Sequence, residues 1–127
     1  MNEGGKVVCM ALFRCSSGSS GGGGETPEIL DFKVVTSGSG PTANVLENTE
    51  SILYAITYTS NSNENTRNTN TSIASHTGCD VTMVDNILTG TTLLKMFKLT
   101  NCQSSVSLTT GSASTSSGKN LMVFKMV

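Results

Sequence analysis

The side chains that could perform chemistry are few, and the closest group is His76 and Cys79, with Cys102 later in the chain. Imidazole and thiolate groups are good zinc ligands, but three of them leave a structural zinc site one ligand short. Cys9 or Cys15 would have to supply the fourth ligand. The sequence therefore predicts no metal site.

A nucleophilic pair of Cys79 and His76 is the second kind of chemistry that this segment could support. A reactive cysteine needs an accessible thiolate. Cys79 alternates with Val81 and Met83, as residues on one face of a strand do, and this pattern directs its side chain into the core. We expect His76 to face solvent at the end of a strand, and we expect no catalytic residue here.

Two glycine-rich segments invite comparison with phosphate-binding loops. Gly21–Gly24 has no lysine after it and leads into a strand, whereas a phosphate cradle needs the N-terminus of a helix. The segment 111–120 has six residues between its glycines, where the nucleotide loop has four, and Asn120 stands in place of Ser or Thr. We interpret these segments as a linker and a hairpin loop, and we expect no cofactor.

The nine carboxylates show no pairing that an acid–base enzyme would need. Asp80 and Asp85 are an odd number of residues apart, which places them on opposite faces of one strand. Glu47 and Glu50 flank a turn. A glycoside hydrolase, by contrast, holds two carboxylates across a cleft. The sequence predicts a protein without enzymatic activity.

The composition favours strands and loops over helices. Charged residues make up 13% of the chain, whereas 18 Ser, 18 Thr, 11 Asn and 13 Gly dominate it. Ser, Asn and Gly favour turns and caps, and Thr favours strands. The formal net charge is −1 and the chain has two Tyr and no Trp, which leaves little to bind a phosphate backbone or to stack on bases. We expect no nucleic-acid partner.

Alternating apolar residues mark about eight short strands separated by turn signals. The clearest is Ser51–Thr59, and within 28–36 the residues Leu30, Phe32 and Val34 share one predicted face. The other candidates are 6–15, 45–46, 72–76, 79–84, 92–100, 106–108 and 121–127, with Asp85-Asn86 and Gly90 as turns around 87–88. Such spacing predicts an all-β fold: an antiparallel β-sandwich of jelly-roll or immunoglobulin-like type, with an N-terminal extended arm.

The arm begins with an apolar run, Val7–Phe13, and a Ser/Gly tract follows it at 16–24. The run is far shorter than the roughly 20 residues that cross a bilayer, so we expect no membrane segment. An apolar strand on a flexible tether predicts docking, either on its own sheet or on a neighbouring subunit. We expect an arm at 1–15, a linker at 16–27 and a β-sandwich domain at 28–127. The expected assembly residues are Val7, Val8, Met10, Leu12 and Phe13.

Residues 60–71 contain no side chain that is fully apolar. Such a segment cannot offset the entropy cost of ordering by burial. We therefore expect an exposed loop, and its surface residues would be Asn61, Asn63, Asn65, Arg67, Asn68 and Asn70.

The segment Met10-Ala-Leu-Phe-Arg-Cys15, with the Ser/Gly tract after it, carries a resemblance to a known group of proteins. The chain is similar to small Gly/Ser-rich, β-structured virion-associated proteins of tailed phages and prophages of gut Firmicutes. Gly78–Thr82 and Phe97–Cys102 resemble short pieces of the same proteins. The resemblance implies a structural virion protein, namely a head-decoration, head-fibre or tail-associated subunit. Its partners would be capsid, tail or baseplate proteins and further copies of itself.

Such a protein would be made in the host cytoplasm and end in the virion. The four cysteines are too few for a disulfide scaffold, and we expect reduced thiols. Two other classes stay open. A receptor- or carbohydrate-binding module would use segments 60–71 and 111–118, although aromatic residues for sugar stacking are scarce. A secreted immunoglobulin-like adhesion domain would need a signal sequence, and we find no such pattern.

Overall fold

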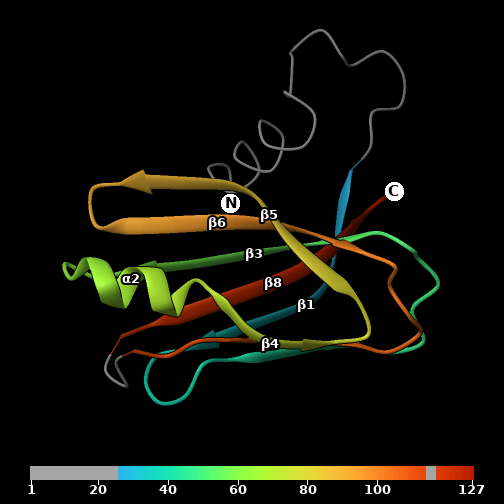
Figure 1. Ribbon diagram of the computed structural model, residues 1–127, viewed down its shortest axis with the longest axis horizontal. Coiled ribbons are helices and arrows are strands. Elements are labelled where there is room, and N and C mark those ends of the chain that lie inside the picture. The colour runs from blue at the N-terminus through green and yellow to red at the C-terminus, as the bar shows by residue number, and fades with distance from the viewer. Residues whose placement is uncertain (1–25, 114–116) are drawn as a thin grey trace, which may run out of the picture.

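The computed structural model of the protein describes residues 26–113 and 117–127. These residues form two antiparallel sheets and one short helix (Figure 1). The strands are β1 (Pro27–Val35), β2 (Thr42–Val45), β3 (Leu53–Ser60), β4 (Ile73–Thr77), β5 (Asp80–Thr89), β6 (Thr92–Thr100), β7 (Val106–Thr110) and β8 (Lys119–Met126), and the helix is α2 (Glu64–Asn70). The predicted all-β, antiparallel fold of about eight strands is confirmed. The predicted arm lies outside the described residues, and β1 already begins at Pro27, the last residue of the expected linker.

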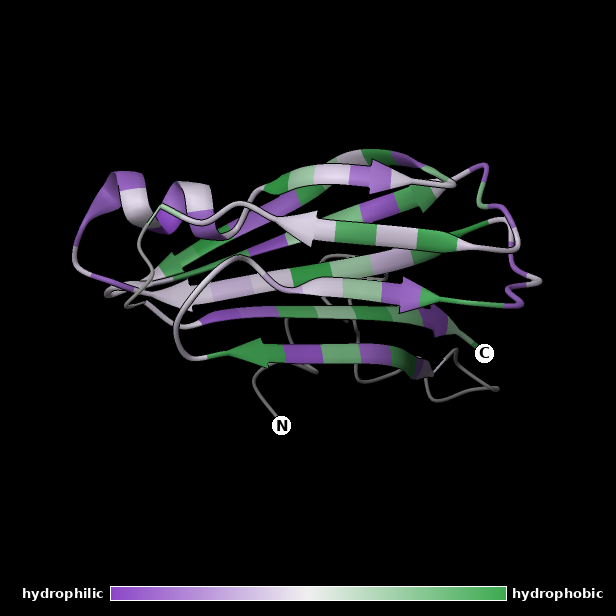
Figure 2. Cartoon of the chain, turned by 90° about the horizontal axis from the view of Figure 1, so that it is seen from below, coloured by the Kyte–Doolittle hydropathy of each residue, from purple (hydrophilic) through white to green (hydrophobic). Residues whose placement is uncertain are grey.

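The larger sheet has the order β1-β8-β3-β6-β5, and the smaller has the order β2-β7-β4. Figure 2 shows the strands edge-on in two layers. The main core lies where the sheets face each other, and its buried residues are Ala43, Val45, Leu53, Ala55, Phe97, Leu99, Val106, Leu108, Leu121 and Val123. We call the face of the larger sheet that meets this core its inner face, and the opposite face its outer face.

β3 lies at the centre of the larger sheet, between β8 and β6. Its inner-face residues Leu53 and Ala55 are fully buried, as are Thr57 and Thr59 further along the strand. Tyr54, Ile56 and Tyr58 alternate with them on the outer face, which is the division that the sequence pattern predicts. The strand therefore supplies large side chains to both faces, as a central strand can.

β1 departs from the predicted alternation because a β-bulge lies between Ile29 and Asp31. An extra residue in one strand shifts the side chains that follow it to the other face. Leu30 packs against the main core, whereas Phe32 and Val34 lie on the outer face, opposite Met122 and Asn120 of β8. The prediction that Leu30, Phe32 and Val34 share one face is therefore wrong.

β5 is longer than predicted, because the expected turn at Asp85-Asn86 is a bulge inside the strand. The strand continues to Thr89, and the turn comes at Gly90, whose φ of 63° suits glycine. Met83 lies on the inner face, opposite Phe97, as the pattern predicts, but it is 50% exposed. Both edge strands of the larger sheet thus contain a bulge.

The polar segment 60–71 is largely exposed, as the sequence predicts, but it is not a loop throughout. Its residues 64–70 form α2, a seven-residue helix whose Asn70 is buried, and the following Thr71 is buried too. This helix, the only one in the described ranges, is too short and too polar to cross a membrane.

Hydrogen bonds, and not apolar burial, hold α2 in place. The side chain of Asn63 caps its N-terminus by accepting from the backbone N–H of Thr66 at 2.9 Å. At the other end, the buried hydroxyl of Thr57 donates to the Thr71 carbonyl at 2.6 Å, and Lys95 donates to the Asn68 carbonyl at 3.2 Å. A cation at the last carbonyls also suits the helix dipole. Sequence periodicity could not reveal a helix that is fixed in this way.

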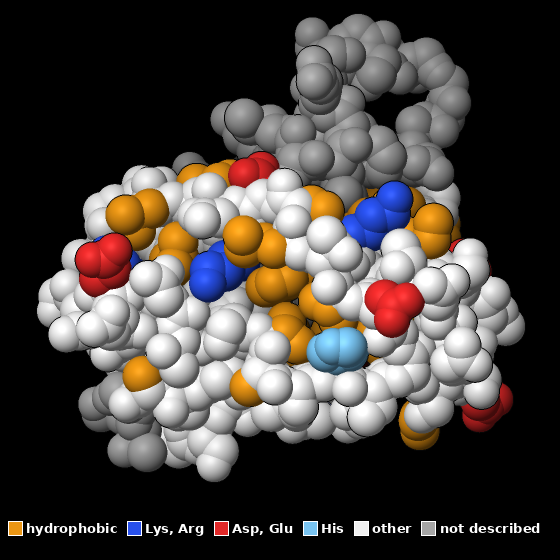
Figure 3. All heavy atoms as spheres, in the orientation of Figure 1, with side chains coloured by type: hydrophobic (Ala, Val, Ile, Leu, Met, Phe, Trp, Pro, Cys, Tyr) orange, Lys and Arg blue, Asp and Glu red, His pale blue; other side chains and the backbone are white. Residues whose placement is uncertain are grey.

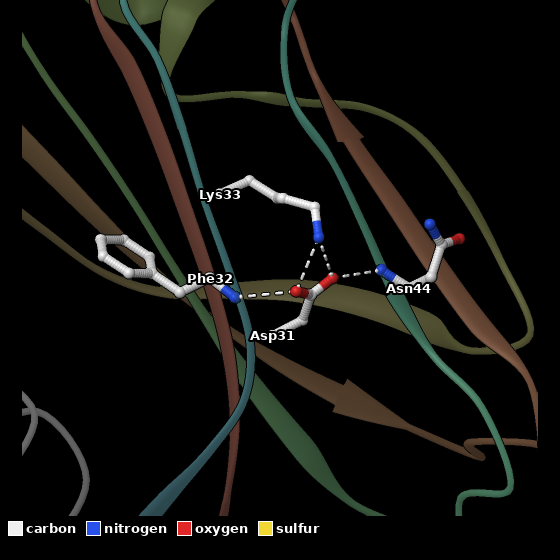
Figure 4. A network of polar contacts seen from close by, with 4 residues as sticks. All are labelled: Asp31, Phe32, Lys33 and Asn44. Carbon is white, nitrogen blue, oxygen red and sulfur yellow. Dashed lines mark hydrogen bonds and ion pairs between the residues drawn. The ribbon is translucent and has the colours of Figure 1, made fainter.

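Asp31 links the two sheets at the β1 edge (Figure 4). Its carboxylate accepts from the backbone N–H of Asn44 in β2 at 2.8 Å and from that of Phe32 at 3.0 Å. The ammonium of Lys33 completes the cluster at 2.8 Å. Burial alone would raise the pKa of Asp31, but the hydrogen bonds and the charge of Lys33 outweigh it, so the pKa lies below its ordinary value. The ionised carboxylate therefore stabilises the folded state.

Replacement of this carboxylate should weaken the junction between the sheets. We expect Asp31→Asn to lower the free energy of unfolding by about 1 kcal/mol at pH 7, because an amide loses the charged bond to Lys33. The pKa of Asp31 is depressed in the folded state, so its contribution is complete above the unfolded pKa of about 4 and is lost as the pH falls through the folded value. Urea unfolding of both proteins at pH 7 and pH 3 should show the difference shrinking in acid.

Asp85→Asn is the matched control, because Asp85 also sits at an edge-strand bulge and accepts from the next backbone N–H, that of Asn86, at 2.8 Å. It should change the free energy of unfolding by less than about 0.5 kcal/mol. Equal effects of the two substitutions at pH 7 would contradict the inter-sheet role of Asp31.

The α2 anchor can be tested on β3. Thr57→Val keeps the shape of the side chain but leaves the Thr71 carbonyl without its buried donor, so we expect a loss of about 1–2 kcal/mol in urea unfolding. Thr82→Val, on the exposed surface of β5, should be close to neutral. A neutral Thr57→Val would show that the hydroxyl does not anchor the helix.

Candidate assembly surface

The sequence-predicted site residues fall into two groups. Val7, Val8, Met10, Leu12 and Phe13 lie outside the described residues. In the polar segment, Asn63, Asn65 and Asn68 are exposed, Asn61 and Arg67 are partly buried, and Asn70 is buried. The guanidinium of Arg67 donates to the Asn61 carbonyl at 2.9 Å, so these two residues serve the structure of the segment. The polar residues therefore do not form one common exposed surface.

The outer face of the larger sheet carries a second group of large apolar residues. Ile56, Met96 and Phe124 are buried on it, and Tyr54, Tyr58, Leu94, Met122 and Met126 pack around them. The register places Ile56 directly opposite both Met96 and Met122. The rings of Tyr54 and Phe124 stack with centroids 5.6 Å apart. Cross-strand pairs of this kind stabilise a sheet and give this face a firm apolar centre.

At the β1 edge this apolar surface opens to solvent. Ile29, Phe32 and Val34 follow one another along the outer face of β1, and they are 56%, 43% and 57% exposed. We call these three residues the β1 apolar stripe. Ile29 lies opposite Phe124 and Phe32 lies opposite Met122, so the stripe continues the apolar centre of the face. Exposed apolar surface that is contiguous in this way marks an interaction site more often than scattered single residues do.

Sequence reasoning missed the stripe because it placed Phe32 and Val34 with Leu30. The alternation of apolar residues with Asp31 and Lys33 is compatible with either orientation of the strand. No Gly or Pro within the segment 29–31 marks the bulge. Only the pairing register with β8 settles which face these residues occupy.

The inner face has an uncovered part as well. Met83 and Leu88 of β5 lie opposite Phe97 and Leu93 of β6 on this face, yet they are 50% and 54% exposed. Figure 3 shows hydrophobic side chains gathered in the middle of this side of the molecule, between lysine or arginine side chains and beside the histidine. This surface is a second, more divided apolar area, because charged and polar groups interrupt it.

The remaining side chains considered for chemistry, His76 and Lys119, form hydrogen bonds with nearby backbone carbonyls. His76 is exposed, as predicted, and its Nδ1 donates to the Cys79 carbonyl at 3.0 Å. Lys119, which follows the second glycine-rich segment, is buried in β8, and its ammonium donates to the Ser117 carbonyl at 2.8 Å. Burial lowers the pKa of Lys119. Across residues 26–113 and 117–127, no three side chains of His, Cys, Asp or Glu are grouped to hold a metal ion.

Comparisons of the chain with protein-family models, with curated proteins and with solved structures give no match.

Proposed function

We propose that the protein is a structural subunit of a tailed-phage virion that assembles with further copies of itself through the outer face of its larger sheet. The observation that carries the assembly role is the β1 apolar stripe, whose three side chains are 43–57% exposed in the single chain. Removing such side chains from water contributes roughly 25 cal/mol per Å² of apolar area. The stripe is continuous with the buried apolar residues of the outer face, so a partner would pack against well-ordered side chains.

The partner docks on the face of the sheet, because both edges are poorly suited to strand addition. Each edge strand contains a bulge, between Ile29 and Asp31 in β1 and between Met83 and Asp85 in β5. Bulges and charged side chains at an edge oppose pairing with a further strand. At the β1 edge, the Asp31 carboxylate is also engaged with the backbone of β2.

The occupant that we propose is the apolar run Val7–Phe13 of a second copy of the chain. The chain enters the sandwich at Thr26, whose backbone pairs with that of Val127 at 2.7 and 2.8 Å, next to the start of β1. Residues 16–25, the part of the expected linker before Thr26, could span about 35 Å if fully extended. That length would let the apolar run contact the sheet of a neighbouring copy. The described residues leave the stripe exposed, and the occupant in this proposal comes from another molecule. The apolar run of one copy and the apolar face of the next are complementary.

The virion assignment rests on the resemblance of the opening segment and of the polar β domain to phage proteins. The proposed contact is consistent with it. A contact between an arm and a different surface of the next copy is heterologous, and it builds rings or extended arrays. Such arrays suit a component that is present in many copies.

A mixing experiment tests the contact between arm and face. Leu12→Asp with Phe13→Asp disables the arm in the full chain, and Phe32→Lys with Val34→Thr disables the face. Each variant alone should sediment as a monomer, whereas the unaltered protein should form larger species. A mixture of the two variants should form a 1:1 dimer, because one intact arm then meets one intact face. Analytical ultracentrifugation measures all four samples.

Leu88→Lys is the control substitution, since Leu88 is equally exposed but lies on the inner face of the other edge strand. It should leave the sedimentation of the protein unchanged, and circular dichroism should show every variant folded. A mixture in which both variants stay monomeric would rule out exchange of the arm between copies.

The virion assignment has a separate test. Phage particles banded in a density gradient should contain the protein at a fixed ratio to the major capsid protein, at a level of many copies per particle. Protein found only at the top of the gradient would contradict the virion role. The mixing experiment is independent of that outcome.

A further inference from the structure

Cys79 and Cys102 lie side by side at one end of the sandwich. The last register pair of β5 and β6 at this end is Asp80 with Thr100, so Cys79 is one residue beyond the pair and Cys102 is two residues beyond it. Both are free thiols, partly buried and packed against the main core. Each cysteine is among the neighbours that shift the pKa of the other, so the two side chains lie close together. Cys79 and Cys102 are far apart in the sequence, and nothing in the sequence indicates that the fold brings them together.

The backbone around the two thiols is clamped. The N–H of Gln103 donates to the Gly78 carbonyl at 2.8 Å, and the N–H of Cys102 donates to the Ser51 carbonyl at 3.1 Å. Gly78 has a φ of 79°, and a Cβ on it would lie 2.0 Å from the Ser105 carbonyl oxygen, so the two segments are in close contact. The two cysteines are thus held next to each other by bonds that do not depend on the thiols.

We propose that Cys79 and Cys102 are a redox-controlled pair that closes to an intramolecular disulfide and locks this end of the sandwich. The oxidant is a low-molecular-weight disulfide such as oxidised glutathione. The Cys102 thiolate attacks one sulfur of that disulfide, which releases one glutathione thiolate and leaves a mixed disulfide. The Cys79 thiolate then attacks the Cys102 sulfur and releases the second glutathione. Two protein thiols lose two protons and two electrons in total, and one oxidised glutathione becomes two reduced molecules.

The surroundings of the pair set the order and the speed of these steps. Burial raises the pKa of Cys102, and its contacts with the Leu53 backbone and with Cys79 partly oppose that rise, which makes Cys102 the first nucleophile. Burial and the neighbouring Cys102 and Asp80 raise the pKa of Cys79 to about 11. Burial also leaves the pKa of Cys102 above its ordinary value. Both thiols are therefore protonated near pH 7, so closure is slow there and speeds up in alkaline solution.

The test uses the full chain with Cys9→Ser and Cys15→Ser, which leaves Cys79 and Cys102 as the only thiols. Incubation with oxidised glutathione should give a species whose mass is lower by two hydrogen atoms. Its melting temperature should exceed that of the reduced protein by on the order of 10 °C, as expected for a cross-link that closes a loop of this length. The rate of closure should rise about tenfold per pH unit between about pH 7 and pH 8.5.

Cys79→Ser and Cys102→Ser, each added to the same background, are the controls. Neither can lose two hydrogen atoms within one chain, and Cys79→Ser should collect the glutathione adduct faster than Cys102→Ser. Two outcomes would overturn the proposal. One is a two-thiol protein that stops at the glutathione adduct without closing, and the other is a closed form that melts no higher than the reduced form. The proposal stands or falls independently of the assembly role.

Discussion

The central constraint on this molecule is that a five-stranded sheet is covered by a sheet of three strands. The core between the sheets buries the inner-face side chains of β3, β6 and β8, which are the three middle strands of the larger sheet. The same three strands also carry large apolar side chains on the outer face, where Ile56, Met96 and Phe124 gather. A sheet whose central strands are apolar on both sides needs a cover on both sides. The smaller sheet covers the inner face. On the outer face, the β1 apolar stripe is left exposed.

The edges of the larger sheet show how the molecule limits association. A β-bulge in each edge strand distorts the ladder of backbone groups that another strand would use. In β1 the bulge has a second effect, because it turns Leu30 into the core and leaves Phe32 and Val34 on the outer face. One local irregularity thus opposes association through the edge and presents apolar surface on the face. The Asp31 carboxylate, beside the bulge, holds the smaller sheet to the same edge.

The sequence predicts the strands well and their faces only in part. For β3 the alternation of Leu53 and Ala55 with Tyr54 and Ile56 is uninterrupted, and both the strand and its faces are confirmed. In β1, period-two reasoning is wrong after the bulge, since nothing in the local sequence marks an extra residue. In β5 it places Asp80 and Asp85 on opposite faces, whereas the bulge puts both on the outer face, opposite Thr100 and Met96. The helix α2 was missed for another reason. Its residues have no apolar stripe, and its position depends on Thr57 and Lys95, which belong to strands elsewhere in the chain.

The polar composition of the chain acquires a structural meaning from these contacts. Buried threonines on β3 reach carbonyls outside the sheet: Thr57 donates to Thr71, and Thr59 donates to Gly118. Each hydroxyl fills the place of an apolar side chain and also satisfies a backbone group that the fold would otherwise bury without a partner. A chain rich in Ser, Thr and Asn can therefore order its connecting segments with few apolar residues. The large apolar side chains are then concentrated in the larger sheet, on both of its faces, and this is why so small a domain carries an apolar face beyond the one that its own core uses.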